Sequence, residues 1–169
     1  MHALAVPVVL ALGANLGDRV ATIRRAIAML SDDVLHDVRA SALYETEPVG
    51  YTEQPSFINM AVSGMTLLPA LELHHRCKKI ELDLGRTPRA KWHEREIDID
   101  VVFYGSSVVH EADLMIPHPR MHERRFVLQP CADIVPTMLH PVFLRRVEEL
   151  LTDCSDSAAV QQLSPDHTS

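Results

Sequence analysis

The sequence lacks the short motifs that identify several common classes of enzyme. No Walker A motif, G-x-G-x-x-G, H-E-x-x-H or G-x-S-x-G occurs, which argues against a glycine-rich phosphate cradle, a zinc protease site and a serine nucleophile. The segment GANLG is too short and generic to count as a phosphate loop. The three cysteines are widely spaced and form no C-x-x-C pair, so neither a disulfide framework nor a cysteine zinc site is indicated.

The chain also lacks an uninterrupted apolar run long enough to cross a membrane. Its first residues, MHALAVPVVLALGANLGD, are apolar, but no basic segment precedes them and Gly13 and Asn15 interrupt them. We therefore expect neither a signal peptide nor a membrane span, and a protein of the reducing cytoplasm.

Acidic residues exceed basic ones, which limits the kinds of partner. The net charge of −7 and the pI near 5.8 argue against nucleic acid or an anionic membrane as the main partner. The segment between Arg76 and Arg95 is nevertheless rich in lysine and arginine. An acidic protein with one basic segment indicates a small anionic ligand. We also expect the protein to be a monomer.

The hydrophobic patterns predict one α+β domain over residues 1–151. Strands are expected at 8–12, 38–45, 57–67 and 97–105, and helices at 18–31 and 69–85. This βαββαβ order is that of the ferredoxin-like fold, an antiparallel sheet with two helices on one face. Residues 106–128 predict a short hairpin and loop, 142–151 a last helix, and 152–169 a polar, disordered tail.

Two aspartates, Asp98 and Asp100, lie in an otherwise apolar strand. Because residues two apart in a strand share a face, both carboxylates should lie together. The opposite face should be the core face and is formed by Ile97, Ile99, Val101 and Phe103. A solvated outer face is one interpretation. The pair would repel there and neither residue favours a strand, so we favour a bound divalent cation, Mg²⁺, which binds few carboxylates together with water and phosphates.

Arginines on both sides of this strand favour phosphate as the anion. Arg86, Arg89 and Arg95 precede the aspartates, and the later segment HPRMHERRF adds more cations. The planar guanidinium fork suits phosphate oxygens. The alternative interpretation is a solvated basic loop.

Five segments taken together resemble a known family. ALGANLGD, YETEPVGYTEQPSFIN, LGRTPRAKW, EREIDIDVVFYG and IPHPRMHERRFVLQP follow, in order, the pattern of the 6-hydroxymethyl-7,8-dihydropterin pyrophosphokinases of folate biosynthesis. The resemblance runs through about residues 8–145. It implies transfer of pyrophosphate from ATP to the pterin, with release of AMP. The alternative is a non-catalytic ferredoxin-like domain that senses a metal or an anion.

The resemblance also implies the residues of the site. It assigns two Mg²⁺ ions to Asp98 and Asp100, which with Arg86 and Arg95 form the catalytic set. The residues expected to bind ATP are Glu81, Arg86, Trp92, Arg95, Val101, His118 and Arg124. The residues expected to bind the pterin are Thr46, Pro48, Val49, Phe57, Asn59, Trp92 and Phe126.

The segment 85–95 is rich in cations and has no apolar periodicity, so we predict that it closes over bound phosphates. Because Trp92 is the only tryptophan, its fluorescence reports on that segment. A non-hydrolysable ATP analogue with Mg²⁺ and the pterin should change its emission and slow its quenching by acrylamide, as a lid that excludes water would. Equal shielding of Trp92 with and without ligands would contradict this prediction.

Overall fold

The computed structural model describes residues 4–47, 53–87 and 95–164. Its first part is made of β1 (Val6–Ala14), α1 (Arg19–Asp33), β2 (His36–Ala40), β3 (Tyr44–Thr46), β4 (Phe57–Thr66), α2 (Ala70–Asp83) and β5 (Asp98–Tyr104). Its second part is made of β6 (Val109–Glu111), β7 (Leu114–Ile116), a 3-10 turn (Met121–Glu123), α3 (Arg125–Ile134), α4 (Val147–Thr152) and β8 (Val160–Gln162).

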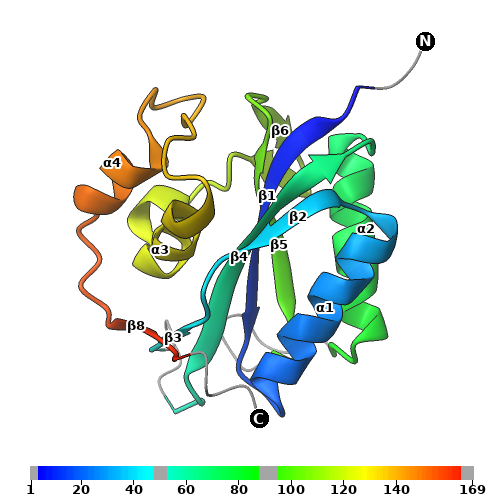
Figure 1. Ribbon diagram of the computed structural model, residues 1–169, viewed down its shortest axis with the longest axis vertical. Coiled ribbons are helices and arrows are strands. Elements are labelled where there is room, and N and C mark those ends of the chain that lie inside the picture. The colour runs from blue at the N-terminus through cyan, green and yellow to red at the C-terminus, as the bar shows by residue number, and fades with distance from the viewer. Residues whose placement is uncertain (1–3, 48–52, 88–94, 165–169) are drawn as a thin grey trace.

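The main sheet has the strand order of a ferredoxin-like fold. The order is β5-β1-β4-β3-β8, with β2 also paired to β4, and every pairing between these strands is antiparallel. Helices α1 and α2 lie on one side of the sheet, and α3 and α4 lie on the other (Figure 1). The predicted α+β fold is therefore confirmed, and the second pair of helices covers the sheet face that α1 and α2 leave open.

The two long helices form where the sequence supplies a start signal and an apolar stripe. In α1 the Asp18 carboxylate accepts a hydrogen bond from the Ala21 backbone N–H at 3.1 Å, which caps the helix. In α2 the buried residues Leu73, Cys77 and Ile80 recur at helical spacing. After α2 the chain turns at Gly85, whose φ of +94° lies in the left-handed region that glycine adopts without strain.

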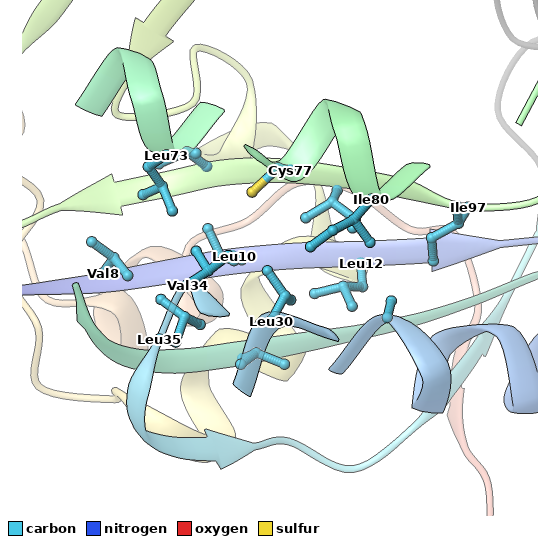
Figure 2. Close-up of a cluster of buried hydrophobic side chains, with 14 of the residues drawn as sticks. Val8, Leu10, Leu12, Leu30, Val34, Leu35, Leu73, Cys77, Ile80 and Ile97 are labelled. Carbon is cyan, nitrogen blue, oxygen red and sulfur yellow. The ribbon is translucent and has the colours of Figure 1, made fainter. Parts of the chain in front are cut away.

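The larger core cluster lies between the sheet and these two helices. Figure 2 shows Val8, Leu10 and Leu12 of β1 beneath Leu73, Cys77 and Ile80 of α2, with Leu30 of α1 beside them. All of these side chains are buried. Because alternate residues of β1 face this core, the residues between them face the opposite side of the sheet.

A β-bulge in β5 changes which face its last residues occupy. Val9 pairs with Phe103 and Leu10 pairs with Val101, so Val102 is an extra residue without a partner on β1. As a result Val102 and Phe103 both pack in the second core cluster, under α3. The prediction that Phe103 shares a face with Val101 is therefore wrong, because strict alternation ends at the bulge.

The predicted strand 38–45 is two short strands, β2 and β3, which pair with successive parts of β4. The interruption is at Ser41, whose backbone N–H donates to the Ala61 carbonyl at 2.9 Å while its Oγ accepts from the Ala61 N–H at 2.8 Å. A side-chain oxygen thus replaces a backbone acceptor, and β4 keeps its hydrogen bonds across the break.

The C-terminal part of the chain is more ordered than the sequence predicts. The hairpin β6–β7 is confirmed, but residues predicted as loop include the start of α3, and the last helix begins at Val147 rather than at residue 142. The predicted disorder after residue 152 is wrong for residues 152–164, because β8 pairs with β3. No helix in the described ranges is both long and apolar enough to span a membrane.

We predict that Leu73→Ala lowers the free energy of unfolding by about 2–5 kcal/mol, because Leu73 is fully buried between α2 and the sheet and its truncation leaves a cavity. Leu82→Ala on the same helix is the matched control. Leu82 is 67% exposed, so its loss should change stability by less than about 0.5 kcal/mol. Urea titration measures both values, and equal losses would place Leu73 outside the core.

Candidate active site

A pocket opens on the sheet face beneath α3, where β1 ends and β4 and β5 begin. β1 and β5 contribute Ala11, Gly13, Asp98, Asp100 and Val102, and β4 and β3 contribute Phe57, Asn59, Met60 and Thr46. The remaining lining residues are Leu12, Glu47, Arg95, His118, Arg124, Phe126 and Val127. One side of this pocket is therefore charged, and the other carries an amide and aromatic rings.

Asp98 and Asp100 both face the pocket, as the alternation of β5 predicts. Two arginines hold Asp98: Arg86 donates to its Oδ1 at 3.0 Å and Arg95 donates to its Oδ2 at 2.8 Å. Burial acts to raise the pKa of Asp98, but the positive charges of Lys78, Arg95 and Arg86 outweigh it and hold the pKa below its ordinary value. Asp98 is therefore a charged carboxylate.

Asp100 is less fully compensated. Lys78 Nζ lies 3.6 Å from its Oδ1, beyond the distance of a hydrogen bond. Burial, followed by the negative charge of Asp98, raises the pKa of Asp100 above its ordinary value. The pair therefore holds negative charge that an additional cation in the pocket would stabilise.

Glu81 organises the cations behind the pair. Its carboxylate is almost completely buried and accepts hydrogen bonds from Lys78 Nζ at 2.8 Å, from the Ile99 backbone N–H at 3.2 Å and from Arg86. Lys78 also donates to the Ile99 carbonyl at 3.2 Å. A buried carboxylate requires such partners, and they hold α2 against β5 at the position of the two aspartates.

The opposite end of the pocket is built around Asn59. This amide is buried, and its Nδ2 donates to Thr46 Oγ1 at 2.6 Å, which fixes its orientation across β3 and β4. Phe57 lies on the same face of β4, two residues away. An oriented amide beside an aromatic ring suits the edge and face of a flat heterocycle.

Gly13 makes room for this amide. A Cβ at position 13 would lie 2.6 Å from Asn59 Oδ1 and 3.7 Å from the Phe57 ring. Only glycine therefore allows β1 to run this close to Asn59. The sequence analysis did not identify Gly13 as a site residue, because GANLG is too generic to indicate a phosphate loop. The signal that could have identified Gly13 is its position directly after a buried apolar run.

Asn15 is a second residue that the sequence interpretation missed. It is buried, its Nδ2 donates to Gln54 Oε1 at 2.8 Å and to the Pro55 carbonyl at 3.1 Å, and its Oδ1 accepts from the Arg95 N–H at 2.7 Å. Its own backbone N–H donates to the Arg95 carbonyl at 3.1 Å. The amide of Asn15 thus links two segments: its nitrogen holds the residues before β4, and its oxygen holds the backbone of Arg95.

The third wall comes from the segment that leads into α3. The backbone N–H of His118 donates to the Val102 carbonyl at 3.1 Å. Burial lowers the pKa of His118, an effect that the carboxylate of Asp100 opposes. Arg124 lies over the Phe126 ring, 5.6 Å from its centroid. Burial, and then the charge of Arg120, lowers the pKa of Arg124.

The structure brings most of the predicted site residues together. The pocket is lined by Thr46, Phe57, Asn59, Arg95, Asp98, Asp100, His118, Arg124 and Phe126. Arg86 lies behind the pocket and donates to Asp98. Glu81 accepts a hydrogen bond from Arg86 and so is linked to Asp98 through it. The Val101 side chain packs in the core below α2, so only its backbone could contact a ligand. Pro48, Val49 and Trp92 lie outside the described residues.

The donor set fits Mg²⁺ as a partner of a phosphorylated ligand. Among the described residues no group of three or more histidine, cysteine, aspartate or glutamate side chains could hold a metal by itself. Asp98 and Asp100 offer two carboxylates on one face, at a position where the second carboxylate lacks full compensation. Mg²⁺ uses such a pair when substrate phosphates and water complete its octahedron.

Comparisons with known proteins identify relatives across most of the chain. Residues 9–136 match the family model of 7,8-dihydro-6-hydroxymethylpterin-pyrophosphokinase. A 2-amino-4-hydroxy-6-hydroxymethyldihydropteridine pyrophosphokinase of Bacillus subtilis is 43% identical over 74% of this chain and 75% of its own length. The Aquifex aeolicus protein of the same name is 37% identical over 84% of this chain and 88% of its own length.

Longer proteins contain the same unit. A folate synthesis bifunctional protein of Arabidopsis thaliana is 42% identical over 77% of this chain, which spans 27% of that protein. A crystal structure of wild-type Plasmodium falciparum HPPK-DHPS with pteroate has a TM-score of 0.69 at 17% identity, over 88% of this chain and 44% of that one, and supports the fold alone. By the match of its sequence over residues 9–136, the chain belongs to the 7,8-dihydro-6-hydroxymethylpterin-pyrophosphokinase family.

Proposed function

We propose that the protein transfers the pyrophosphoryl group of ATP to 6-hydroxymethyl-7,8-dihydropterin and releases AMP, a step of folate biosynthesis. The observation that carries this proposal is one pocket with two kinds of wall. A carboxylate pair with neighbouring cations lies at one end, and a buried amide in a part of the pocket that two aromatic side chains also line lies at the other. A sensor of a metal or an anion would have no use for the second wall, and the pyrophosphokinase names of the relatives do not favour that alternative.

The charged wall binds the triphosphate. Asp98 and Asp100 would hold Mg²⁺, which supplies neutralisation of phosphate charge and polarisation of phosphoryl oxygens. Arg86 and Arg95 are oriented by Asp98. Arg124 and His118 line the same pocket from the segment that leads into α3. Cationic and hydrogen-bonding groups would therefore surround the phosphates, where charge develops during phosphoryl transfer.

The second wall binds the pterin. Asn59, held by Thr46, offers both a donor group and an acceptor group to the edge of the heterocycle. Phe57 and Phe126 line the same pocket from β4 and α3 and cover the faces of the ring. This position directs the hydroxymethyl group toward the charged wall.

In the reaction, the hydroxymethyl oxygen forms a bond to the β-phosphorus as the bond from that phosphorus to the α,β-bridging oxygen breaks. The hydroxyl proton is lost, and AMP leaves with the bridging oxygen. The chain contributes orientation and charge, because both substrates are held by groups that neighbouring residues fix in place. Arg95 is held at its guanidinium by Asp98 and at its backbone by Asn15, so both ends of this residue are fixed in place.

We predict that Asp98→Asn and Asp100→Asn each lower kcat for AMP production by about 100-fold or more, because each removes a ligand charge while changing little volume. The defect should be largest at limiting Mg²⁺. Asp113→Asn, an exposed carboxamide substitution in the β6–β7 turn, is the matched control and should leave the rate unchanged. Near-normal turnover of either site variant at limiting Mg²⁺ would remove the metal pair from the mechanism.

We also predict that Gly13→Ala and Asn59→Ala both weaken pterin binding, by about 1–3 kcal/mol each. The first introduces a methyl group against Asn59 Oδ1, and the second removes the amide. Affinity for a non-hydrolysable ATP analogue measured without pterin should change little, because neither residue belongs to the charged wall. Calorimetry with each ligand tests this, and equal losses for both ligands would make Asn59 a structural residue.

A further inference from the structure

The segment that follows α4 contacts two walls of the pocket that are far apart in the sequence. We call residues 154–163 the C-terminal strap. It leaves α4, bonds to the first residue of α3, and ends in β8, which lies beside β3 (Figure 1). The match to the family model ends at residue 136, before the strap begins.

The first attachment is to Arg125. The guanidinium of Arg125 donates from Nε to the Asp156 carbonyl and from Nη2 to the Cys154 carbonyl, both at 3.0 Å. The backbone N–H of Arg125 donates to Asp156 Oδ2, also at 3.0 Å. Three hydrogen bonds therefore join this one residue to the strap.

Asp156 also supplies a helix cap from a distant part of the chain. Arg124 occupies the N-cap position of α3 and makes no side-chain capping bond. The Asp156 carboxylate accepts the N–H of the first helical residue instead, and its Oδ1 accepts from the Ala158 N–H at 3.0 Å. A carboxylate at a helix N-terminus satisfies a free donor and opposes the positive end of the helix dipole.

The second attachment is to β3. Tyr44 pairs with Gln162, Glu45 with Gln161 and Thr46 with Val160. The Leu163 N–H donates to the Leu43 carbonyl at 2.9 Å, which continues the ladder by one residue. Since β3 would otherwise be an edge of the sheet, the strap gives its outer side a hydrogen-bonded partner.

Both attachments lie next to residues that line the pocket. Arg124 and Phe126 flank Arg125, and Thr46 at the end of β3 orients Asn59. We infer that Asp156 and Arg125 are positioning residues, through which the strap sets the separation between Phe126 and Asn59 and so the affinity for the pterin. This inference rests on the proposed function, because it assigns those two side chains to the pterin.

Except for Arg124, which precedes Arg125, the charged wall is built independently of the strap. Asp98, Asp100, Arg86 and Lys78 come from β5, α2 and the residues just after α2, none of which pairs with the strap. Loss of the strap should therefore affect the two substrates unequally. A strap that only stabilised the fold would affect them equally, and this difference separates positioning from stability.

The test compares Asp156→Ala with Asp156→Asn in the full chain. The alanine variant should bind 6-hydroxymethyl-7,8-dihydropterin about tenfold more weakly in the presence of a non-hydrolysable ATP analogue and Mg²⁺, while affinity for the analogue alone stays within about twofold. Asparagine should restore most of the affinity, because its amide oxygen can accept the same N–H of Arg125. Gln161→Pro, which removes a backbone donor from β8, should reproduce the alanine defect by acting at the other attachment.

Asp153→Ala is the matched control, three residues earlier. Its carboxylate pairs at 2.5 Å with Arg145 on the exposed side of α4 and touches no wall of the pocket. It should leave pterin affinity unchanged. Amide hydrogen exchange should be faster in Asp156→Ala over the first turn of α3 and over β3, and unchanged in β1.

The inference is overturned if Asp156→Ala leaves the affinity for the pterin unchanged, or if it lowers the affinities for the pterin and the ATP analogue equally. Either result leaves the proposed function intact as long as the wild type is an active pyrophosphokinase. Unchanged exchange at the start of α3 and in β3 would overturn the inference too, whatever the substrate. A wild type that binds neither ligand would overturn the proposed function and, with it, the role assigned to the strap.

Discussion

The buried carboxylate of Glu81 constrains the charged half of the site. Because it is removed from water, it must be paired, and its partners are two cations that also contact the aspartates, Lys78 and Arg86, together with the backbone of β5. The same contacts that satisfy Glu81 therefore orient Arg86 on Asp98. Burial, and then the negative charge of Asp98, raise the pKa of Asp100 above its ordinary value, so the pocket favours a further cation.

The other half of the site depends on how the two faces of the sheet are covered. One face is sealed by α1 and α2 over a continuous apolar cluster. The opposite face is covered by α3 only in part, and β1 and β4 turn small or polar residues toward the open part, among them Gly13 and Asn59. The site residues thus lie at one end of one sheet face, where β1 ends and β4 and β5 begin within reach of one ligand.

The sequence was most informative where local patterns decide the structure. Alternation in β5 predicted that Asp98 and Asp100 share a face, and the hydrophobic patterns predicted α1 and α2. Patterns limited to one element could not show the bulge at Val102, which depends on pairing with β1. They also missed β8, because a short polar strand forms only where another strand offers an edge. Asn15 and Gly13 matter through partners about 40 or more residues away, which no local pattern records.

The central claim is that one pocket joins an ATP-binding wall to a pterin-binding wall for transfer of two phosphoryl groups at once. The most direct measurement is the identity of the nucleotide product when the purified protein is incubated with ATP, Mg²⁺ and 6-hydroxymethyl-7,8-dihydropterin. We expect AMP in a one-to-one ratio with pterin pyrophosphate, no ADP, and no AMP when the pterin is omitted. Formation of ADP with a monophosphorylated pterin, or AMP release that does not depend on the pterin, would contradict it.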